Sequence, residues 1–210
     1  MHRYGFRLIS VIVLAGIALA ACKKQPPKAP EPEAEPPKVE TREPPQPPEP
    51  KCEALDEKCE AKAGHRVKIG VEGSFQPPEG WHYAKLETGA VAVAGEQDAA
   101  IAFVHAEGTD AEKVYGALGP MLEQMGVMEV TADQVKKMMK KKPVVEEAGD
   151  LKLDTWDTTC KVKGDAGMML LAVAKLEGGA LVGVVAMKKD AAKDRGGPAR
   201  DALLSVRSGK

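Results

Sequence analysis

Two pairs of side chains have the types that hydrolytic chemistry requires. Cys160 with His105 would make a nucleophile and its general base, and Asp154 with Asp157 would make a carboxylate pair for proton transfer or cation binding. A cysteine on a strand is far more commonly a small buried thiol. Residues three apart on a strand point to opposite faces, which favours solvated aspartates. Both pairs are therefore kept only as the basis of an alternative hypothesis, a hydrolase-type enzyme.

The motifs of the common enzyme and cofactor classes are absent. The sequence contains no Gly-x-Ser-x-Gly, Cys-x-x-Cys, His-Glu-x-x-His, Gly-x-Gly-x-x-Gly or Gly-x-x-x-x-Gly-Lys. His65, His82 and His105 are far apart in sequence, so only the fold could gather them around a metal ion. We therefore predict a protein without catalytic residues, cofactor or metal.

The first residues have the pattern of a processing signal. Arg3 and Arg7 precede an apolar run over residues 8–21, which is short for a membrane span. The run ends in Leu19-Ala20-Ala21-Cys22, which resembles the lipobox of bacterial lipoproteins. The resemblance implies that residues 1–21 are a signal peptide. It also implies that Cys22 becomes acylated and anchors the chain stably in a membrane.

The position after Cys22 bears on which membrane receives the anchor. Enterobacterial lipoproteins that stay in the inner membrane carry an aspartate there, and this sequence has Lys23. The resemblance therefore implies a bacterial cell-envelope protein anchored in the outer membrane and facing the periplasm. The alternative is an ordinary secretory leader with an incidental cysteine, but the small residues before Cys22 favour the lipobox.

A proline-rich segment follows the cysteine. Eleven of the sixteen prolines lie in residues 26–50, which contain no glycine. This composition cannot bury enough apolar surface to fold, and it favours extended polyproline II structure. Residues 22–51 are therefore predicted to be a disordered linker. Fully extended, residues 23–51 would span on the order of 90 Å.

Three cysteines remain after Cys22. Cys52 and Cys59 lie in a stretch whose composition favours helix, and a continuous helix would separate their α-carbons by roughly 10.5 Å. A disulfide needs about 4.4–6.8 Å, so helix and bridge exclude each other. We predict the bridge, within a cysteine-containing segment over residues 52–65, and expect Cys160 to be a buried free thiol.

The charge pattern excludes one class of partner and offers one candidate surface. Beyond the linker the chain carries 22 basic and 25 acidic residues, a net charge of −3 that argues against nucleic-acid binding. The strongest local feature is a run of five lysines around two methionines, which could meet anionic lipid, lipopolysaccharide or an acidic partner. The run consists of Lys136, Lys137, Lys140, Lys141 and Lys142. We favour the alternative that these lysines complement a helix dipole while Met138 and Met139 face the core.

Hydrophobic periodicity predicts the elements of a domain over residues 66–210. Alternating or continuous apolar runs with short turns between them indicate antiparallel strands. These runs lie at 67–71, 81–83, 89–94, 99–106, 151–162, 167–176 and 180–187. Residues 168–173 and 180–185 are apolar on both faces, which predicts that they occupy the centre of the sheet. Capping boxes at Thr109 and Thr131 predict two helices, with a kink or split near Gly119. A last helix is expected from Gly197-Pro198, and Phe75, Trp81, Tyr83 and Phe103 are expected to form a core cluster.

The motif Phe75-Gln76-Pro77-Pro78-Glu79-Gly80-Trp81, followed by this order of elements, resembles the PsbP-like fold. The resemblance implies an α+β domain with an antiparallel sheet of about six or seven strands packed with helices. Members of this group are typically non-enzymatic binding or assembly factors. No binding residue of the family has a matching motif here, so none is transferred.

These patterns lead to one preferred function and one alternative. The preferred function is a lipid-anchored cell-envelope lipoprotein that binds or scaffolds another component without catalysis. Its partners would be the membrane, through Cys22, and an envelope protein or glycan. The alternative is an envelope enzyme that uses Cys160 with His105 or Asp154 with Asp157.

Overall fold

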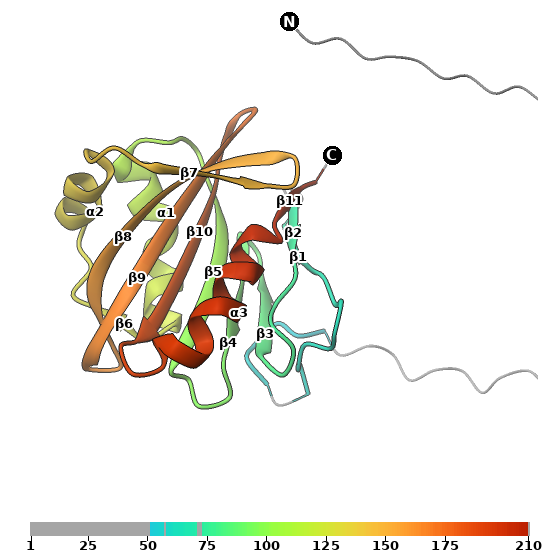
Figure 1. The fold of residues 1–210 in the computed structure, drawn as a ribbon. Coiled ribbons are helices and arrows are strands. Elements are labelled where there is room, and N and C mark those ends of the chain that lie inside the picture. The colour runs from blue at the N-terminus through green and yellow to red at the C-terminus, as the bar shows by residue number, and fades with distance from the viewer. Residues whose placement is uncertain (1–50, 57, 71–72, 210) are drawn as a thin grey trace, which may run out of the picture. The chain divides into compact units, whose positions relative to one another are not determined.

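A large antiparallel sheet of eight strands runs through the computed structural model, which describes residues 51–56, 58–70 and 73–209 (Figure 1). Seven strands follow one another in the order β3 (His82–Leu86), β4 (Gly89–Val93), β5 (Ala99–Ala106), β10 (Gly179–Lys188), β9 (Asp165–Leu176), β8 (Leu151–Val162) and β6 (Val127–Met128). The eighth, β7 (Val144–Ala148), pairs with the first half of β8. The predicted α+β class and antiparallel pairing are confirmed, with one or two more strands than expected. The lipobox and the linker to residue 50 lie outside the described residues.

A second, three-stranded sheet joins the two ends of the domain. It contains β1 (Val67–Ile69), β2 (Gly73–Phe75) and β11 (Arg207–Ser208), with β2 in the middle. Glycine is required in β2, because a Cβ on Gly73 would lie 2.4 Å from the carbonyl oxygen of Arg207. Arg66 strengthens the join by donating a 2.9 Å hydrogen bond to the carbonyl of Ser205.

Helices cover both faces of the large sheet. They are α1 (Ala111–Gln124), α2 (Ala132–Met139) and α3 (Ala192–Leu204). Figure 1 shows α1 and α2 behind the sheet and α3 in front of it. One core, here called the α1-side core, contains Val114, Leu118 and Val135 with the rear side chains of the sheet. The α3-side core contains Ala199, Leu203 and the apolar residues of β1 and β2.

Because both faces are covered, the central strands are apolar on both sides. In β10, Val182 and Val184 lie in the α1-side core, and Leu181 and Val185 lie in the α3-side core. β10 lies between β5 and β9 in the sheet, so the prediction that its continuous apolar run marks the centre is confirmed.

The four aromatic residues predicted to cluster all lie in the α3-side core. Phe75, Trp81, Tyr83 and Phe103 are each at most 5% exposed. The rings of Phe75 and Phe103 are 4.8 Å apart and tilted against each other. The cluster is therefore core and does not form an open binding cage.

One of the two predicted capping boxes is present. At α2 the hydroxyl of Thr131 accepts from the backbone N–H of Gln134, and the Gln134 side chain accepts from the backbone N–H of Thr131. At α1 the prediction is wrong by one residue, because Asp110 is the N-cap and accepts from the N–H of Lys113. A carboxylate also complements the helix dipole, which a threonine cannot do.

Prolines interrupt the helices less than predicted. α1 continues through Pro120 to Gln124 and is not split near Gly119. α3 begins at Ala192 and not at Gly197-Pro198, so Pro198 lies inside it. Both prolines are exposed, so water can hydrogen-bond the carbonyls that they leave free. No helix in the described part of the chain is both long and apolar enough to cross a membrane.

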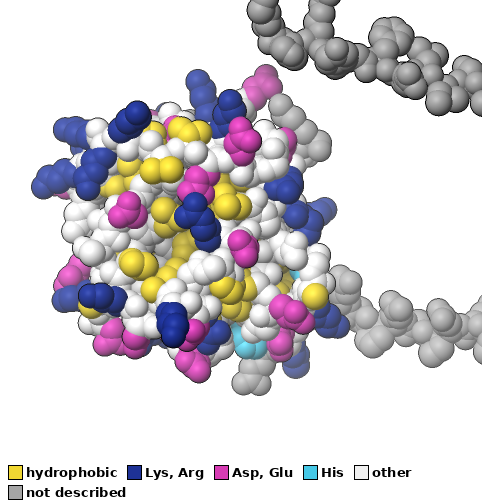
Figure 2. All heavy atoms as spheres, viewed as in Figure 1, with side chains coloured by type: hydrophobic (Ala, Val, Ile, Leu, Met, Phe, Trp, Pro, Cys, Tyr) yellow, Lys and Arg dark blue, Asp and Glu magenta, His cyan; other side chains and the backbone are white. Residues whose placement is uncertain are grey.

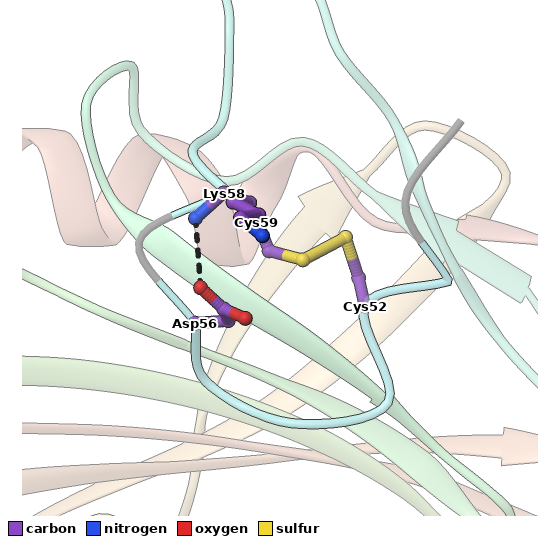
Figure 3. Close-up of a disulfide and its surroundings, with 4 residues drawn as sticks. All are labelled: Cys52, Asp56, Lys58 and Cys59. Carbon is purple, nitrogen blue, oxygen red and sulfur yellow. Dashed lines mark hydrogen bonds between the residues drawn. A yellow bond between two sulfur atoms is a disulfide. The ribbon is translucent and has the colours of Figure 1, made fainter. Parts of the chain in front are cut away.

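The predicted disulfide between Cys52 and Cys59 is present, with α-carbons 5.6 Å apart (Figure 3). The described residues of the segment that it closes, 52–56 and 58–59, are not helical, and its two ends lie along β3. The carbonyl of Cys52 accepts from the N–H of Lys85, and the carbonyl of Cys59 accepts from the N–H of Tyr83. Both sulfur-bearing residues are buried in the α3-side core. We call residues 52–61 the disulfide clasp, because they cover the outer edge of the sheet.

Candidate ligand-binding groove

The structure does not bring Cys160 and His105 together. Cys160 lies on β8 in the α1-side core, and His105 lies on β5, with β9 and β10 between the two strands. His105 follows Phe103 by two residues and therefore shares its face of the sheet, on the α3 side. The two side chains are on opposite faces, so the geometry of a nucleophile and its base is absent for this pair.

Cys160 also lacks the surroundings of a reactive thiol. It is unpaired and 8% exposed. Burial raises the pKa of its thiol to about 11. Only the thiolate is nucleophilic, and a thiol with this pKa stays protonated near neutral pH. Cys160 is therefore a small core residue, as predicted.

Alkylation measures this burial directly. At pH 8 we expect iodoacetamide to modify Cys160 at least about a hundredfold more slowly in the folded protein than in guanidinium, because a pKa raised from 9.0 to about 11 lowers the thiolate fraction by roughly that factor. The same shift makes the folded state less stable as the pH rises from about 9 towards 11, since only the unfolded chain then ionises freely. Intact mass against time gives the alkylation rates of the folded and the unfolded protein, and equal rates would contradict the burial of Cys160.

The two aspartates are also separated. Asp154 pairs with Val173, which lies in the α1-side core, and Asp157 pairs with Leu170, which packs against the α3-side core. They therefore lie on opposite faces of β8, as the spacing predicts. The carboxylate pair of the alternative hypothesis does not form, but Asp157 lines a cavity on the α3 face.

The three histidines are not gathered around a common point. The ring of His65 packs against Tyr83 at 4.9 Å, and His82 lies on β3, where it forms a bridge with Glu60. Across residues 51–56, 58–70 and 73–209, no group of three or more His, Cys, Asp or Glu side chains is placed to hold a metal ion.

The cavity lined by Asp157 is a groove of about 540 Å³. It lies beside α3, which packs on β10 and β5 and leaves part of the sheet uncovered. Its floor is apolar and comes from Met168 and Leu170 of β9 and from Val185 and Met187 of β10. Figure 2 shows hydrophobic side chains exposed in a hollow in the middle of this face. We call this feature the sheet groove; its volume falls within the range of small-molecule sites.

Small residues on α3 keep the sheet groove open. Ala192 and Gly196 form its wall, and a Cβ added to Gly196 would meet only the Met187 sulfur, at 3.9 Å. On the floor, Met168 is 45% exposed although it lies on an interior strand. An apolar side chain left exposed in a concave site is typical of a surface that receives a ligand.

Three charged side chains line the sheet groove, and one of them, Asp157 of β8, lies directly beside Leu170 of the floor. Arg200 of α3 lines it and forms a 2.8 Å ion pair with Glu146 of β7. Lys141 lines it from the connection between α2 and β7, where its carbonyl accepts a 2.9 Å hydrogen bond from the indole of Trp156. The site therefore combines an apolar floor with a mixed and mostly basic margin.

One residue of the lysine run, Lys141, lines the groove, and the others precede or follow it in the chain. Lys136 and Lys137 lie in the last turn of α2 and Lys140 caps it, so they complement the helix dipole as predicted. Met138 is buried and Met139 packs partly against the same core. All five lysines are exposed, and none forms an ion pair with another described residue.

The sequence analysis did not identify the sheet groove. It interpreted residues 168–173 as the sheet centre and gave no role to Gly196 or Arg200. A signal was present, since Asp157 and Thr159 on β8 face the same side as Met168 and Leu170. Polar side chains beside apolar ones on one face indicate that no helix covers that part of the sheet.

Comparisons with known proteins identify no family. No protein-family description and no curated protein match the sequence.

Solved structures with a similar arrangement include three bacterial proteins. A protein from Bacteroides thetaiotaomicron is 12% identical over 68% of this chain, with a TM-score of 0.42, and this chain spans about half (50%) of its length. The cyanobacterial PsbP of Synechocystis is 11% identical and covers 69% of this chain and 91% of its own, with a TM-score of 0.43. LpqN of Mycobacterium tuberculosis, described as involved in cell envelope biogenesis, is 12% identical over 69% of this chain and 89% of its own, with a TM-score of 0.39. At these values no activity, ligand or partner is transferred from them.

Proposed function

We propose that this chain is a cell-envelope lipoprotein whose folded domain binds another envelope component in the sheet groove, without catalysis. The observation that carries the proposal is the groove itself, a concavity of about 540 Å³ with an apolar floor and three charged lining residues, Asp157, Lys141 and Arg200. The alternative enzyme gains no support, because Cys160 and His105 lie on opposite faces and so do Asp154 and Asp157.

The sequence supports the anchored part of the proposal. The lipobox ending at Cys22 would fix the chain to a membrane, and the proline-rich residues 23–51 would act as a spacer between that anchor and the domain. Lys23 after the acylated cysteine favours the outer membrane and a domain that faces the periplasm. An envelope protein or glycan is the partner expected from the sequence, and single lipid molecules are a third class of envelope component that a groove can bind.

Changing Cys22→Ser tests the anchor. We expect an uncut or soluble precursor in place of a mature protein that partitions into detergent, because the hydroxyl of serine does not replace the thiol that is acylated. Detergent-phase partitioning and intact mass give the result, and a matched Cys160→Ser variant should behave as wild type. Unchanged mass and fractionation of Cys22→Ser would contradict the anchor.

Site-specific photo-crosslinking in intact cells tests the groove. A benzophenone side chain introduced at Met168, in the groove, should trap a component that one introduced at Glu112, on the exposed side of α1, does not trap. Blocking the groove with Gly196→Leu should remove the Met168 product. The matched control is Gly116→Leu, since Gly116 lies in α1 on the opposite face and has no atom within 4 Å of an added Cβ.

Both substitutions replace a helical glycine by leucine, so each should raise helix stability by a similar amount. Equal loss of the Met168 product in both variants, or its persistence in Gly196→Leu, would overturn the proposed function.

A further inference from the structure

The lining of the sheet groove indicates what kind of molecule it receives. The floor consists of aliphatic and thioether side chains, Met168, Leu170, Val185 and Met187, and includes no aromatic ring. Unbranched methionines adapt their shape to a flexible apolar partner. Protein partners and flat ring systems are usually held by aromatic anchors, which this groove lacks.

The backbone of the floor has no free hydrogen-bonding groups to offer. β9 is paired with β8 on one side and β10 on the other through the whole stretch that the groove exposes. A peptide lying over these floor strands would bury its own N–H and C=O groups without partners, which is costly. Among the described strands, β8 has an unpaired outer edge at residues 156–160, between its β7 and β6 partners, but that edge does not lie over the apolar floor. A hydrocarbon chain has no such groups to satisfy.

Charge identifies the other end of the molecule. Lys141 lines the groove, and Lys140 and Lys142 flank it in the chain, all exposed and without an ion-pair partner among the described residues. Arg200, the other cation in the lining, is already paired with Glu146, and Asp157 of β8 is the acidic residue in the lining. The three lysines at positions 140–142 outnumber this one carboxylate. An acidic group would therefore be favoured at the Lys141 end.

Building on the proposed function, we propose that the sheet groove binds a single acyl chain that carries an acidic headgroup. The chain lies over Met168, Leu170, Val185 and Met187, and the headgroup lies at Lys141. The occupant is one amphiphile molecule and not the surface of a bilayer, because the groove is a bounded cavity of about 540 Å³.

Titration with defined amphiphiles below their micelle concentrations tests the proposal on the folded protein labelled with ¹³C at the methionine methyls. Dodecanoate should shift the Met168 and Met187 signals and leave those of Met121 and Met138, in the α1-side core, unchanged. Affinity should rise about fourfold for each methylene from decanoate to tetradecanoate, the factor expected for burying one such group. Gly196→Leu should abolish these shifts and Gly116→Leu should preserve them.

The headgroup is tested separately. Lys141→Gln should weaken dodecanoate binding about two- to fivefold, the range for an exposed ion pair, and leave binding of the neutral dodecyl maltoside unchanged. Lys113→Gln, an exposed position on α1, is the control and should change neither. Equal affinity for dodecanoate, dodecyl maltoside and dodecyltrimethylammonium would overturn the acidic headgroup.

Two further outcomes separate this inference from the proposed function. In the first, the Met168 crosslink persists in cells, but no amphiphile shifts the Met168 and Met187 signals or only phosphatidylglycerol vesicles bind. The proposed ligand class is then wrong, and the proposed binding function of the groove stands. If the crosslink is absent as well, both are wrong.

Discussion

Phe103→Ala is expected to lower the free energy of unfolding by about 3–5 kcal/mol, the usual cost of removing a fully buried aromatic side chain. Phe103 is 1% exposed, and its ring contacts that of Phe75 across the α3-side core. The ring also fills the space above Gly183 of β10, where an added Cβ would lie 2.7 Å from it. The substitution therefore opens a cavity between the central strand and the small sheet. Urea unfolding followed by circular dichroism measures the loss.

The control for this prediction is Val144→Ala. Val144 is 64% exposed on β7, so its truncation should change stability by no more than about 0.5 kcal/mol. A loss below about 1 kcal/mol for Phe103→Ala would show that the core beneath α3 collapses around the vacancy or is not packed as described.

Replacing both cysteines of the disulfide clasp by serine is expected to cost about 2.5 kcal/mol, from the entropy that an eight-residue loop regains in the unfolded chain. The effect should be visible locally as well. The N–H groups of Tyr83 and Lys85, which donate to Cys59 and Cys52, should exchange with solvent faster in the variant. Thermal unfolding and hydrogen exchange measure the two effects.

Reduction of the wild-type protein should reproduce the result of the double substitution, because Cys52 and Cys59 form the disulfide of the described chain. A Cys160→Ser variant should still respond to the reductant in the same way. An unfolding midpoint that is insensitive to reductant would contradict a stabilising role for the clasp.

The strands that carry most of the core could be predicted from the sequence. The run at residues 180–185 has no polar face, which is typical of a strand covered on both sides. The run at residues 168–173 likewise predicted a strand, although its Met168 and Leu170 lie in the sheet groove. The capping box at Thr131 was predictable because two short-range hydrogen bonds specify it. Each of these signals lies within a short stretch of sequence, and the packing of the domain keeps the strand or helix that the stretch favours.

Other elements depend on contacts that no local pattern reveals. Thr109 and Asp110 are both good N-caps, and only the path of the chain after β5 decides that Asp110 serves. Gly197-Pro198 indicated a helix start, but α3 begins at Ala192, which packs against the α3-side core. This packing offsets the cost of about 1 kcal/mol for each glycine inside the helix.

The position of the sheet groove also depends on contacts between residues far apart in the sequence. Its floor comes from two strands, its wall from α3 and its basic margin from the connection after α2. The feature that opens it is the absence of side-chain volume at Gly196 and Ala192 over a part of the sheet that α3 does not reach. Only the packing position of that helix, set by distant contacts, determines where the groove lies.

The disulfide clasp has a mechanical consequence. Tension applied through the chain before Cys52 passes through the covalent bridge to Cys59, so residues 53–58 carry none of it. The load reaches the domain at the edge of β3, where Cys59 and Cys52 are hydrogen-bonded to the strand and Ala61 is hydrogen-bonded to Trp81 just before it. A tethered domain pulled from this end would therefore yield first by peeling at one sheet edge, while the sheet groove, bordered by β8 at the other side of the sheet, stays intact.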